Sequence, residues 1–163
     1  MVVLTALLLA EYSPYPLAGV PFAVDIPAID RWLNTQPKPF VVAEVPIPSA
    51  GDLGGLERQQ TRSMLHAMAH WQKTIHGYSG IRRPLHDRLY EDLTGFPDAT
   101  SLAGLREVGV TYVVVHTDDY GIRWRIVEEQ IARTPALTLT HVEGAGRIYV
   151  ISPDASAATR PTP

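Results

Sequence analysis

Histidines and aromatic side chains are concentrated between residues 70 and 86, where the chain reads HWQKTIHGYSGIRRPLH. This segment contains three histidines and no sustained hydrophobic period, which is unusual for a plain connection between two helices. Trp71 and Tyr78 offer flat faces of the kind on which sugars stack, and His70 and His76 add ring nitrogens. Two interpretations stay open: the segment forms one wall of a ligand pocket, or it fixes a buried crossover between two helices.

His66 and His70 have the four-residue spacing at which two imidazoles on one helix bind a zinc ion. A metalloprotease of that type needs Glu directly after the first histidine as general base, whereas this chain has Ala67. The hydrolase interpretation therefore largely fails, and the pattern favours histidines that cap, pack or face water. We expect no metal site and no cofactor.

Glu44 interrupts the apolar run FVVAEVPI, residues 40–47, which is bounded by prolines and predicts a strand buried on both faces. A carboxylate inside such a strand is costly unless it is paired or accepts several hydrogen bonds. We therefore predict that Glu44 is buried and contacts a histidine, an arginine such as Arg82 or Arg83, or backbone N–H groups. The sequence does not distinguish a structural ion pair from a ligand contact.

A second apolar run, VTYVVVH at residues 110–116, predicts another buried strand that ends at His116. Residues just beyond the carboxyl end of such a strand lie where open α/β sheets bind their ligands. Asp118 and Asp119 follow His116, and either of them is also suited to cap the next helix. The sequence favours the cap slightly over the ligand contact.

The order of these two strands also predicts where the segment of residues 70–86 lies. If the strands are parallel neighbours, Glu44 and His116 face the same crevice, and the chain that follows the intervening helix returns to that edge. We therefore predict that Glu44, His76, Tyr78 and His116 converge around one concavity.

The elements that must position these residues alternate between strands and helices. Helices are expected over residues 56–71, 84–95, 99–108 and 117–134, and residues 136–152 predict a hairpin. The pattern indicates an α/β layered sandwich with a mixed, mainly parallel sheet and a C-terminal β-hairpin. The apolar positions that we expect to face inward on the first and last of these helices are Leu56, Met64, Leu65, Met68, Trp71, Ile122, Ile126, Val127 and Ile131.

Four segments are expected along the chain. The apolar run at residues 1–11 is about half of the roughly 20 residues that span a membrane, so we interpret it as the end of a transmembrane helix that begins upstream. A buried N-terminal element and a signal peptide are the alternatives. Proline-rich residues 12–25 form a tether, residues 26–152 form the α/β soluble domain, and residues 153–163 form a disordered tail.

The composition excludes several classes of function. A formal charge of -3 gives no basic surface for nucleic acid, so no nucleic-acid partner is expected. The chain has no cysteine, which excludes disulfides, zinc-thiolate sites and thiol catalysis. Phosphate-binding loops, the GxSxG motif and EF-hand loops are also missing from the sequence, so no known catalytic motif supports a soluble enzyme.

The order of these pieces resembles the C-terminal soluble region of bacterial polytopic membrane glycosyltransferases of the GT-C type and related membrane proteins. The resemblance covers nearly the whole chain, from residue 1 to about residue 152. Its most specific parts are the dipeptide His70-Trp71 followed by GYSG at residues 77–80, and His116 at the end of a strand. Relatives of this kind are expected to carry Asn before the GYSG run, whereas this chain has His76.

The resemblance implies an accessory extracytoplasmic domain that is joined to the membrane part of the same parent protein. Such a domain binds a glycan acceptor or a lipid-linked sugar, or orients the membrane part. It is not catalytic alone, because the catalytic acidic residue of GT-C enzymes lies in a loop near the first transmembrane helices, which this chain lacks. The expected ligand-binding residues are Glu44, His70, Trp71, His76, Tyr78 and His116.

Two other functions stay open. The first is a free-standing small α/β enzyme that uses Glu44 and His116 at the strand ends as acid and base. The second is a protein-interaction module without a small-molecule site.

Overall fold

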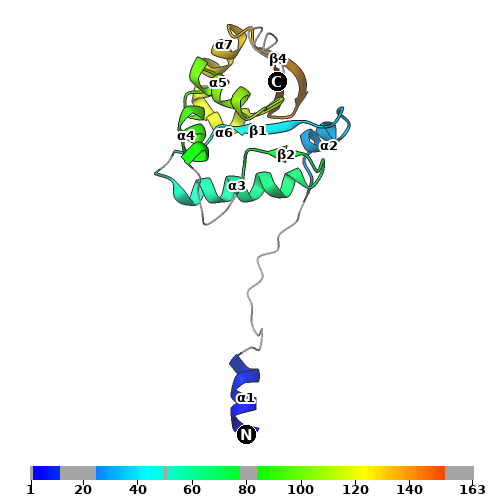
Figure 1. Ribbon diagram of the computed structural model, residues 1–163, viewed down its shortest axis with the longest axis vertical. Coiled ribbons are helices and arrows are strands. Elements are labelled where there is room, and N and C mark those ends of the chain that lie inside the picture. Colours follow the sequence, from blue (N-terminus) through cyan, green and yellow to red (C-terminus); the bar gives the residue numbers. More distant parts are fainter. Residues whose placement is uncertain (1, 12–24, 50, 78–83, 153–163) are drawn as a thin grey trace, which may run out of the picture.

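A five-stranded mixed sheet forms the centre of the structure, a computed structural model that describes residues 2–11, 25–49, 51–77 and 84–152 (Figure 1). The strands are β1 (Val41–Val45), β2 (Lys73–Thr74), β3 (Tyr112–His116), β4 (Leu137–Glu143) and β5 (Gly146–Ile151). Their order across the sheet is β2-β1-β3-β5-β4. The pairs β1-β2 and β1-β3 are parallel, whereas β3-β5 and β4-β5 are antiparallel.

The predicted class, an α/β fold with a mixed sheet and a C-terminal hairpin, is confirmed. The expectation that the sheet is mainly parallel is not, because only two of the four strand pairs are parallel and the hairpin adds antiparallel pairs. The two apolar runs form β1 and β3, because β-branched residues suit strands that are covered on both faces. The parallel register pairs Val42 with Tyr112 and Glu44 with Val114. The carboxyl ends of β1 and β3 therefore lie side by side.

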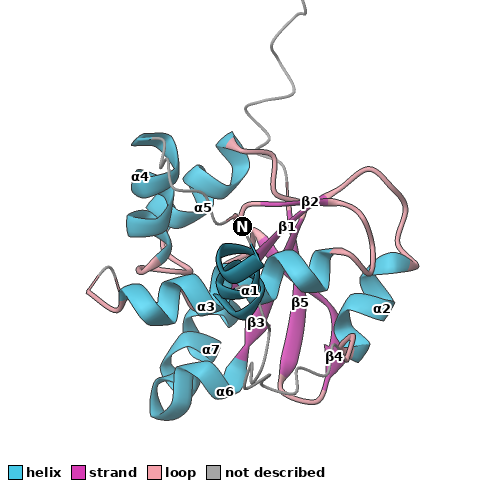
Figure 2. Cartoon of the chain, turned by 90° about the horizontal axis from the view of Figure 1, so that it is seen from below, coloured by secondary structure: helices cyan, strands magenta, loops and turns pink. Residues whose placement is uncertain are grey.

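Helices cover both faces of this sheet. They are α2 (Ala28–Asn34), α3 (Leu53–Ala67), α4 (Pro84–Leu93), α5 (Ala99–Glu107), α6 (Thr117–Tyr120), the 3-10 helix η1 (Gly121–Arg123) and α7 (Trp124–Ala132). α2 packs on the face that carries Val42 and Val114, and α3 crosses in front of the strands in the view of Figure 2. α4, α5 and α7 pack on the opposite face, around Ala43, Val45 and Val113.

Local sequence signals explain where several of these elements begin and end. The Asp98 carboxylate accepts a hydrogen bond from the Ser101 N–H and so caps α5. Asp52 caps α3 in the same way through the Gly55 N–H, so this helix begins earlier than the expected residue 56. The hairpin of β4 and β5 turns at Gly144, whose positive φ of 52° favours glycine.

The expected inward face of α3 is mostly wrong. Apart from Leu56, the apolar residues predicted to be core face solvent or are half-buried. The exposed ones are Met64, Met68 and Trp71, and the buried polar ones are Gln59, Gln60 and Ser63. The physical reason is that α3 covers the sheet face that carries Glu44, and a buried carboxylate requires polar neighbours rather than an apolar lid.

The segment of residues 117–134 is also not one helix. Gly121 has a φ of +54°, which interrupts the helical path between α6 and α7. Within α7 itself, Ile126 and Val127 are neighbours that point about 100° apart, so they cannot both face the core. Val127 and Ile131 are buried as expected, whereas Ile122 and Ile126 are exposed.

The N-terminal apolar run forms a helix, α1 (Val2–Glu11), whose leucines are exposed. No helix among the described residues is long and apolar enough to cross a membrane. The end of a transmembrane helix thus stays a prediction. The predicted tether, apart from Asp25, and the predicted disordered tail lie outside the described residues.

Candidate functional site

The crevice beyond the carboxyl ends of β1 and β3 is the topological switch point of the sheet. From β1 the chain passes through α3 to β2 on one side, and then through α4 and α5 to β3 on the other side. α3, in the first connection, brings Ser63 to Glu44, whereas α4 and α5, in the second, pack with Ala43 and Val113 on the opposite face, so the chain diverges at the end of β1. Open α/β sheets bind ligands in crevices of this kind.

A cleft of about 1130 Å³ opens at this place, between the loop after β1, one side of α3 and the segment after β3. Among the described residues, its walls carry charges of both signs in equal number, three arginines and three carboxylates. They also include amide, hydroxyl and aromatic groups. The charged wall residues are Asp25, Glu57, Arg58, Arg62, Asp119 and Arg123, and the other polar ones include Gln59, Thr61, His66 and Tyr120.

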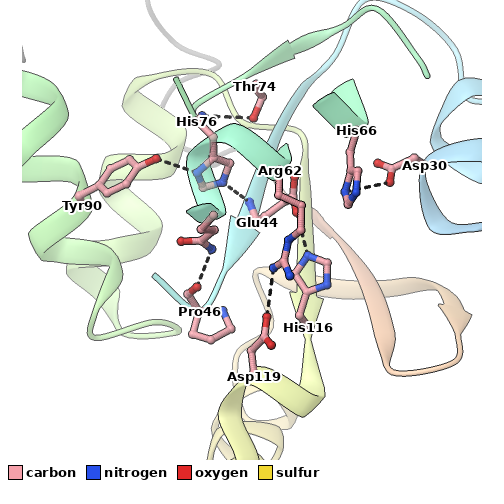
Figure 3. A network of polar contacts seen from close by, with 11 residues as sticks. Asp30, Glu44, Pro46, Arg62, His66, Thr74, His76, Tyr90, His116 and Asp119 are labelled. Atoms are coloured by element: carbon pink, nitrogen blue, oxygen red, sulfur yellow. Dashed lines mark hydrogen bonds and ion pairs between the residues drawn. The ribbon is translucent and has the colours of Figure 1, made fainter. Parts of the chain in front are cut away.

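Arg62 of α3 and Asp119 of α6 face each other across the cleft, with Nη2 3.3 Å from Oδ2 (Figure 3). Asp119 lies inside the first turn of α6, so the expectation that Asp118 or Asp119 caps the next helix is wrong. Each side chain of this pair is nearly half exposed. Such an exposed ion pair contributes little to stability, so a ligand can replace one partner of the pair at little cost to the fold.

A second, smaller hollow of about 270 Å³ adjoins the cleft, because Arg62 and His66 lie in the walls of both. His116, at the end of β3, lines this hollow, and Glu143 and Gly146 of the β4-β5 hairpin close its far side. The smaller hollow thus presents two imidazoles and one guanidinium to the same space.

Glu44 and His116 form the centre of a buried polar network (Figure 3). His116 Nε2 lies 2.8 Å from Glu44 Oε2, and Glu44 is only 5% exposed. Burial alone would raise the pKa of Glu44, but the hydrogen bond from His116 and the nearby rings of His76 and His116 lower it to about 2. Glu44 is therefore ionised at neutral pH and can only accept, so His116 donates from Nε2.

His76 approaches the same strand from the other side of the network. Its Nε2 lies 2.7 Å from the backbone nitrogen of Glu44 and accepts that N–H, while its Nδ1 lies 2.7 Å from the Tyr90 hydroxyl. Burial lowers the pKa of His76 to about 4 against the opposing charge of Glu44. His76 is thus a neutral imidazole with its proton on Nδ1, where it donates to Tyr90.

Asp30 and His66 form a second carboxyl and imidazole pair that the sequence reasoning missed. Asp30 is 4% exposed, and its Oδ2 lies 3.6 Å from His66 Nδ1. Burial, followed by the negative charge of Glu44, raises the pKa of Asp30 to about 7. A signal was available, because Asp30 sits between Ile29 and Leu33 on the apolar side of a short amphipathic helix.

The predicted ligand residues therefore separate into three groups. Glu44, His76 and His116 contact one another through Glu44, and the predicted burial of Glu44 beside a histidine is confirmed. Of the three only His116 lines a hollow, because Glu44 and His76 are buried beneath it, so the predicted convergence around one concavity is not what these residues form. Trp71 precedes β2, whose residues pair with the first residues of β1, so it lies at the opposite end of that strand from the cleft. Tyr78 lies outside the described residues.

His70 lies at the same end as Trp71 rather than at the cleft. It is buried against the ring of Phe40, with centroids 5.5 Å apart, and its Nδ1 accepts the N–H of Gln72. The zinc spacing of His66 and His70 is therefore not used, because the two imidazoles contact different elements. Within the described ranges no group of three His, Asp or Glu side chains is arranged to hold a metal ion.

The sequence reasoning also missed the arginines of the cleft. Arg58 and Arg62 lie four residues apart, which places them on one side of α3 directly after the glycine-rich loop, and this spacing was readable in the sequence. Comparison with known proteins gave no match, whether the chain was set against family models, curated proteins or solved structures.

Proposed function

We propose that the chain is an accessory ligand-binding domain of a membrane glycosyltransferase-like protein, and that its cleft binds a glycan acceptor or the sugar of a lipid-linked donor. The observation that carries this proposal is the equal number of arginines and carboxylates in the cleft at the switch point. Sugar hydroxyls both donate and accept hydrogen bonds, so they suit a wall with groups of both kinds. A polyanion would instead require an excess of arginine and lysine.

The proposed location of the domain in the cell rests on the sequence resemblance and not on the cleft. In this proposal the domain lies on the extracytoplasmic side, joined to the membrane part of the parent protein, and does not turn over substrate by itself. The apolar helix α1 is consistent with a chain that continues towards a membrane, because its exposed leucines have a high affinity for lipid.

Calorimetry with the full chain tests the proposal. The probes are free hexoses, short oligosaccharides and a hexosyl phosphate ester of a ten-carbon prenol. We expect saturable binding of at least one probe and a loss of about tenfold or more in Arg62→Ala, because a charged hydrogen bond to the ligand contributes roughly 1.5–3 kcal/mol. Arg125→Ala is the matched control, since Arg125 is also an exposed helical arginine in an ion pair but does not line the cleft.

Failure of all probes to bind, or equal weakening by the two arginine variants, would remove the cleft as a sugar site. Binding of the prenyl phosphate ester but not of the free hexoses would assign the lipid-linked donor. Binding of oligosaccharides alone would assign the acceptor.

A second function, acid and base catalysis by a free-standing enzyme, is favoured by the hydrogen bond between His116 and Glu44. A carboxylate behind an imidazole fixes its tautomer and stabilises its charged form, and His116 lines the smaller hollow. Turnover of nitrophenyl glycosides, esters or phosphates by the full chain, lost in His116→Gln and kept in His141→Gln, would support this function. Absence of turnover with all three classes of substrate would exclude this second function and leave the binding domain as the proposed one.

A further inference from the structure

Trp71 presents its indole to solvent from a backbone that is fixed in an unusual conformation. Its φ of +55° lies in the left-handed region, where a bulky residue is strained, and its side chain is 77% exposed. Three hydrogen bonds hold the surrounding backbone: the Trp71 N–H donates to the Ala67 carbonyl, the Gln72 N–H donates to His70 Nδ1, and the Gln72 amide donates to the Trp71 carbonyl. A strained backbone that is held in place by several hydrogen bonds is typical of functional positions.

An apolar side chain and two basic ones lie close to Trp71 along the chain or at the same edge of the sheet. Met68, the C-cap of α3, is also exposed. Gln72 Oε1 accepts the N–H of Phe40, so the loop before β1 lies against the turn of Trp71. This loop and turn bring Lys38 and Lys73 to the same edge of the sheet, and both lysines are exposed. We call Met68, Trp71, Lys38 and Lys73 the Trp71 edge.

The charge of this edge is opposite to that of the rest of the chain. Residues 34–40 and 64–77 contain two lysines and no Asp or Glu. The whole chain has 14 basic and 17 acidic residues, so the remainder has 12 basic and 17 acidic residues and a net charge of -5. The exposed apolar side chains of this edge are thus accompanied by positive charge, whereas the remainder of the chain has a net negative charge.

We propose that the Trp71 edge is a docking surface for an anionic lipid bilayer, separate from the cleft and beyond the proposed binding of sugars. Trp, Met and Lys together match the interface of a bilayer, where an indole enters the headgroup region and lysines contact lipid phosphates. The edge lies at the amino end of β1, opposite the cleft, so a docked domain keeps the cleft open to the aqueous side.

The length of the chain permits this docking together with insertion of α1. The 14 residue steps from Glu11 to Asp25 span at most about 50 Å. A five-residue strand such as β1 spans only about 17 Å. α1 and the Trp71 edge can therefore reach the same bilayer.

Vesicle flotation with the full chain tests the proposal, with 30% phosphatidylglycerol in phosphatidylcholine as probe and pure phosphatidylcholine as reference. Trp71→Gly removes the indole and relieves the positive φ, so it does not endanger the fold. We expect Trp71→Gly to lower the partition coefficient by on the order of tenfold. Lys38→Gln with Lys73→Gln lowers it by about fivefold per lysine on the anionic vesicles only.

Ile122→Ser is the matched control, because Ile122 is 99% exposed and lies in η1, far along the chain from this edge. It should leave partitioning unchanged. A chain with Trp32→Phe and Trp124→Phe keeps Trp71 as its one tryptophan, and its fluorescence should be quenched by brominated lipids. Equal partitioning of Trp71→Gly and the unmodified chain would assign the binding to α1 and overturn the proposal, as would the absence of vesicle binding. A saturable change of the Trp71 emission with free sugars, without quenching by brominated lipid, would overturn it in favour of a sugar platform.

Discussion

His116 and Glu44 meet across two parallel strands, 72 positions apart in the sequence, with 2.8 Å between Nε2 and Oε2. The register explains the contact, because Glu44 pairs with Val114 and His116 lies two residues further on the same face. The pair joins the interior of the sheet to the hollow at its carboxyl end. One side chain is thus buried and ionised, and the other is within reach of a ligand.

Loss of the Glu44 carboxylate is expected to destabilise the fold. Glu44→Ala leaves the His116 donor without its acceptor and removes a buried charge from its partners, so we expect a loss of about 3 kcal/mol in the free energy of unfolding. Glu44→Gln keeps an acceptor oxygen and should cost about 1 kcal/mol. Urea unfolding at pH 7 measures both, with the exposed Glu57→Ala as control. A change below about 0.5 kcal/mol in Glu44→Ala would show that the pair contributes nothing to the fold.

The tautomer of His76 is open to direct observation. Because its Nε2 accepts the Glu44 N–H, two-bond nitrogen correlation spectra at pH 7 should show a neutral ring protonated at Nδ1. Its titration midpoint should lie near the lowered pKa of about 4 rather than near 6.5. His76→Ala leaves that N–H without an acceptor and should cost about 2 kcal/mol. A ring that titrates near 6.5 would place His76 in water instead.

Asp30 should make stability fall as pH rises from about 4 to 7. Its pKa is 3.8 ordinarily and about 7 in the fold, so in this window the folded state binds more protons than the unfolded state. Asp30→Asn removes this loss. As the pH rises from 4 to 8, its free energy of unfolding should therefore increase by on the order of 2 to 4 kcal/mol relative to that of the unmodified chain. The lowered pKa of His76 makes stability rise with pH, but it does so equally in both chains. The difference between the urea unfolding series of Asp30→Asn and of the unmodified chain therefore reports Asp30 alone. Parallel pH profiles would contradict the raised pKa.

Removal of the N-terminal helix should not change the fold. A chain that begins at Asp25 lacks α1, whose described side chains are exposed, so its thermal midpoint should match that of the full chain within about 2 °C. Its solubility should rise, because the exposed leucines are lost. Loss of the cooperative thermal transition in the shortened chain would show that α1 belongs to the core.

Strand positions were predictable because both buried runs are nearly uninterrupted apolar segments, and Glu44 stood out as a carboxylate within one of them. The polar side of α3 was not predictable by the same rule, since helical spacing of Met64 and Met68 indicates a core face whenever the surface beneath is apolar. Here that surface contains Glu44, so the helix is turned the other way. The missed partners, Asp30 and Arg62, come from elements far from Glu44 in sequence, and no local pattern records their approach.

The central claim is that the cleft beyond β1 and β3 binds a sugar, and amide chemical-shift mapping on the isotope-labelled full chain tests it most directly. The probe is the hexosyl phosphate ester of a ten-carbon prenol, titrated beside the free hexose. The account predicts that the largest shifts cluster at Arg62, His116 and Asp119 and disappear in Arg62→Ala, while the spectrum of Arg125→Ala responds like that of the unmodified chain. Shifts that cluster at Trp71 and leave Arg62 and His116 unmoved, or a spectrum that does not change with either probe, would contradict it.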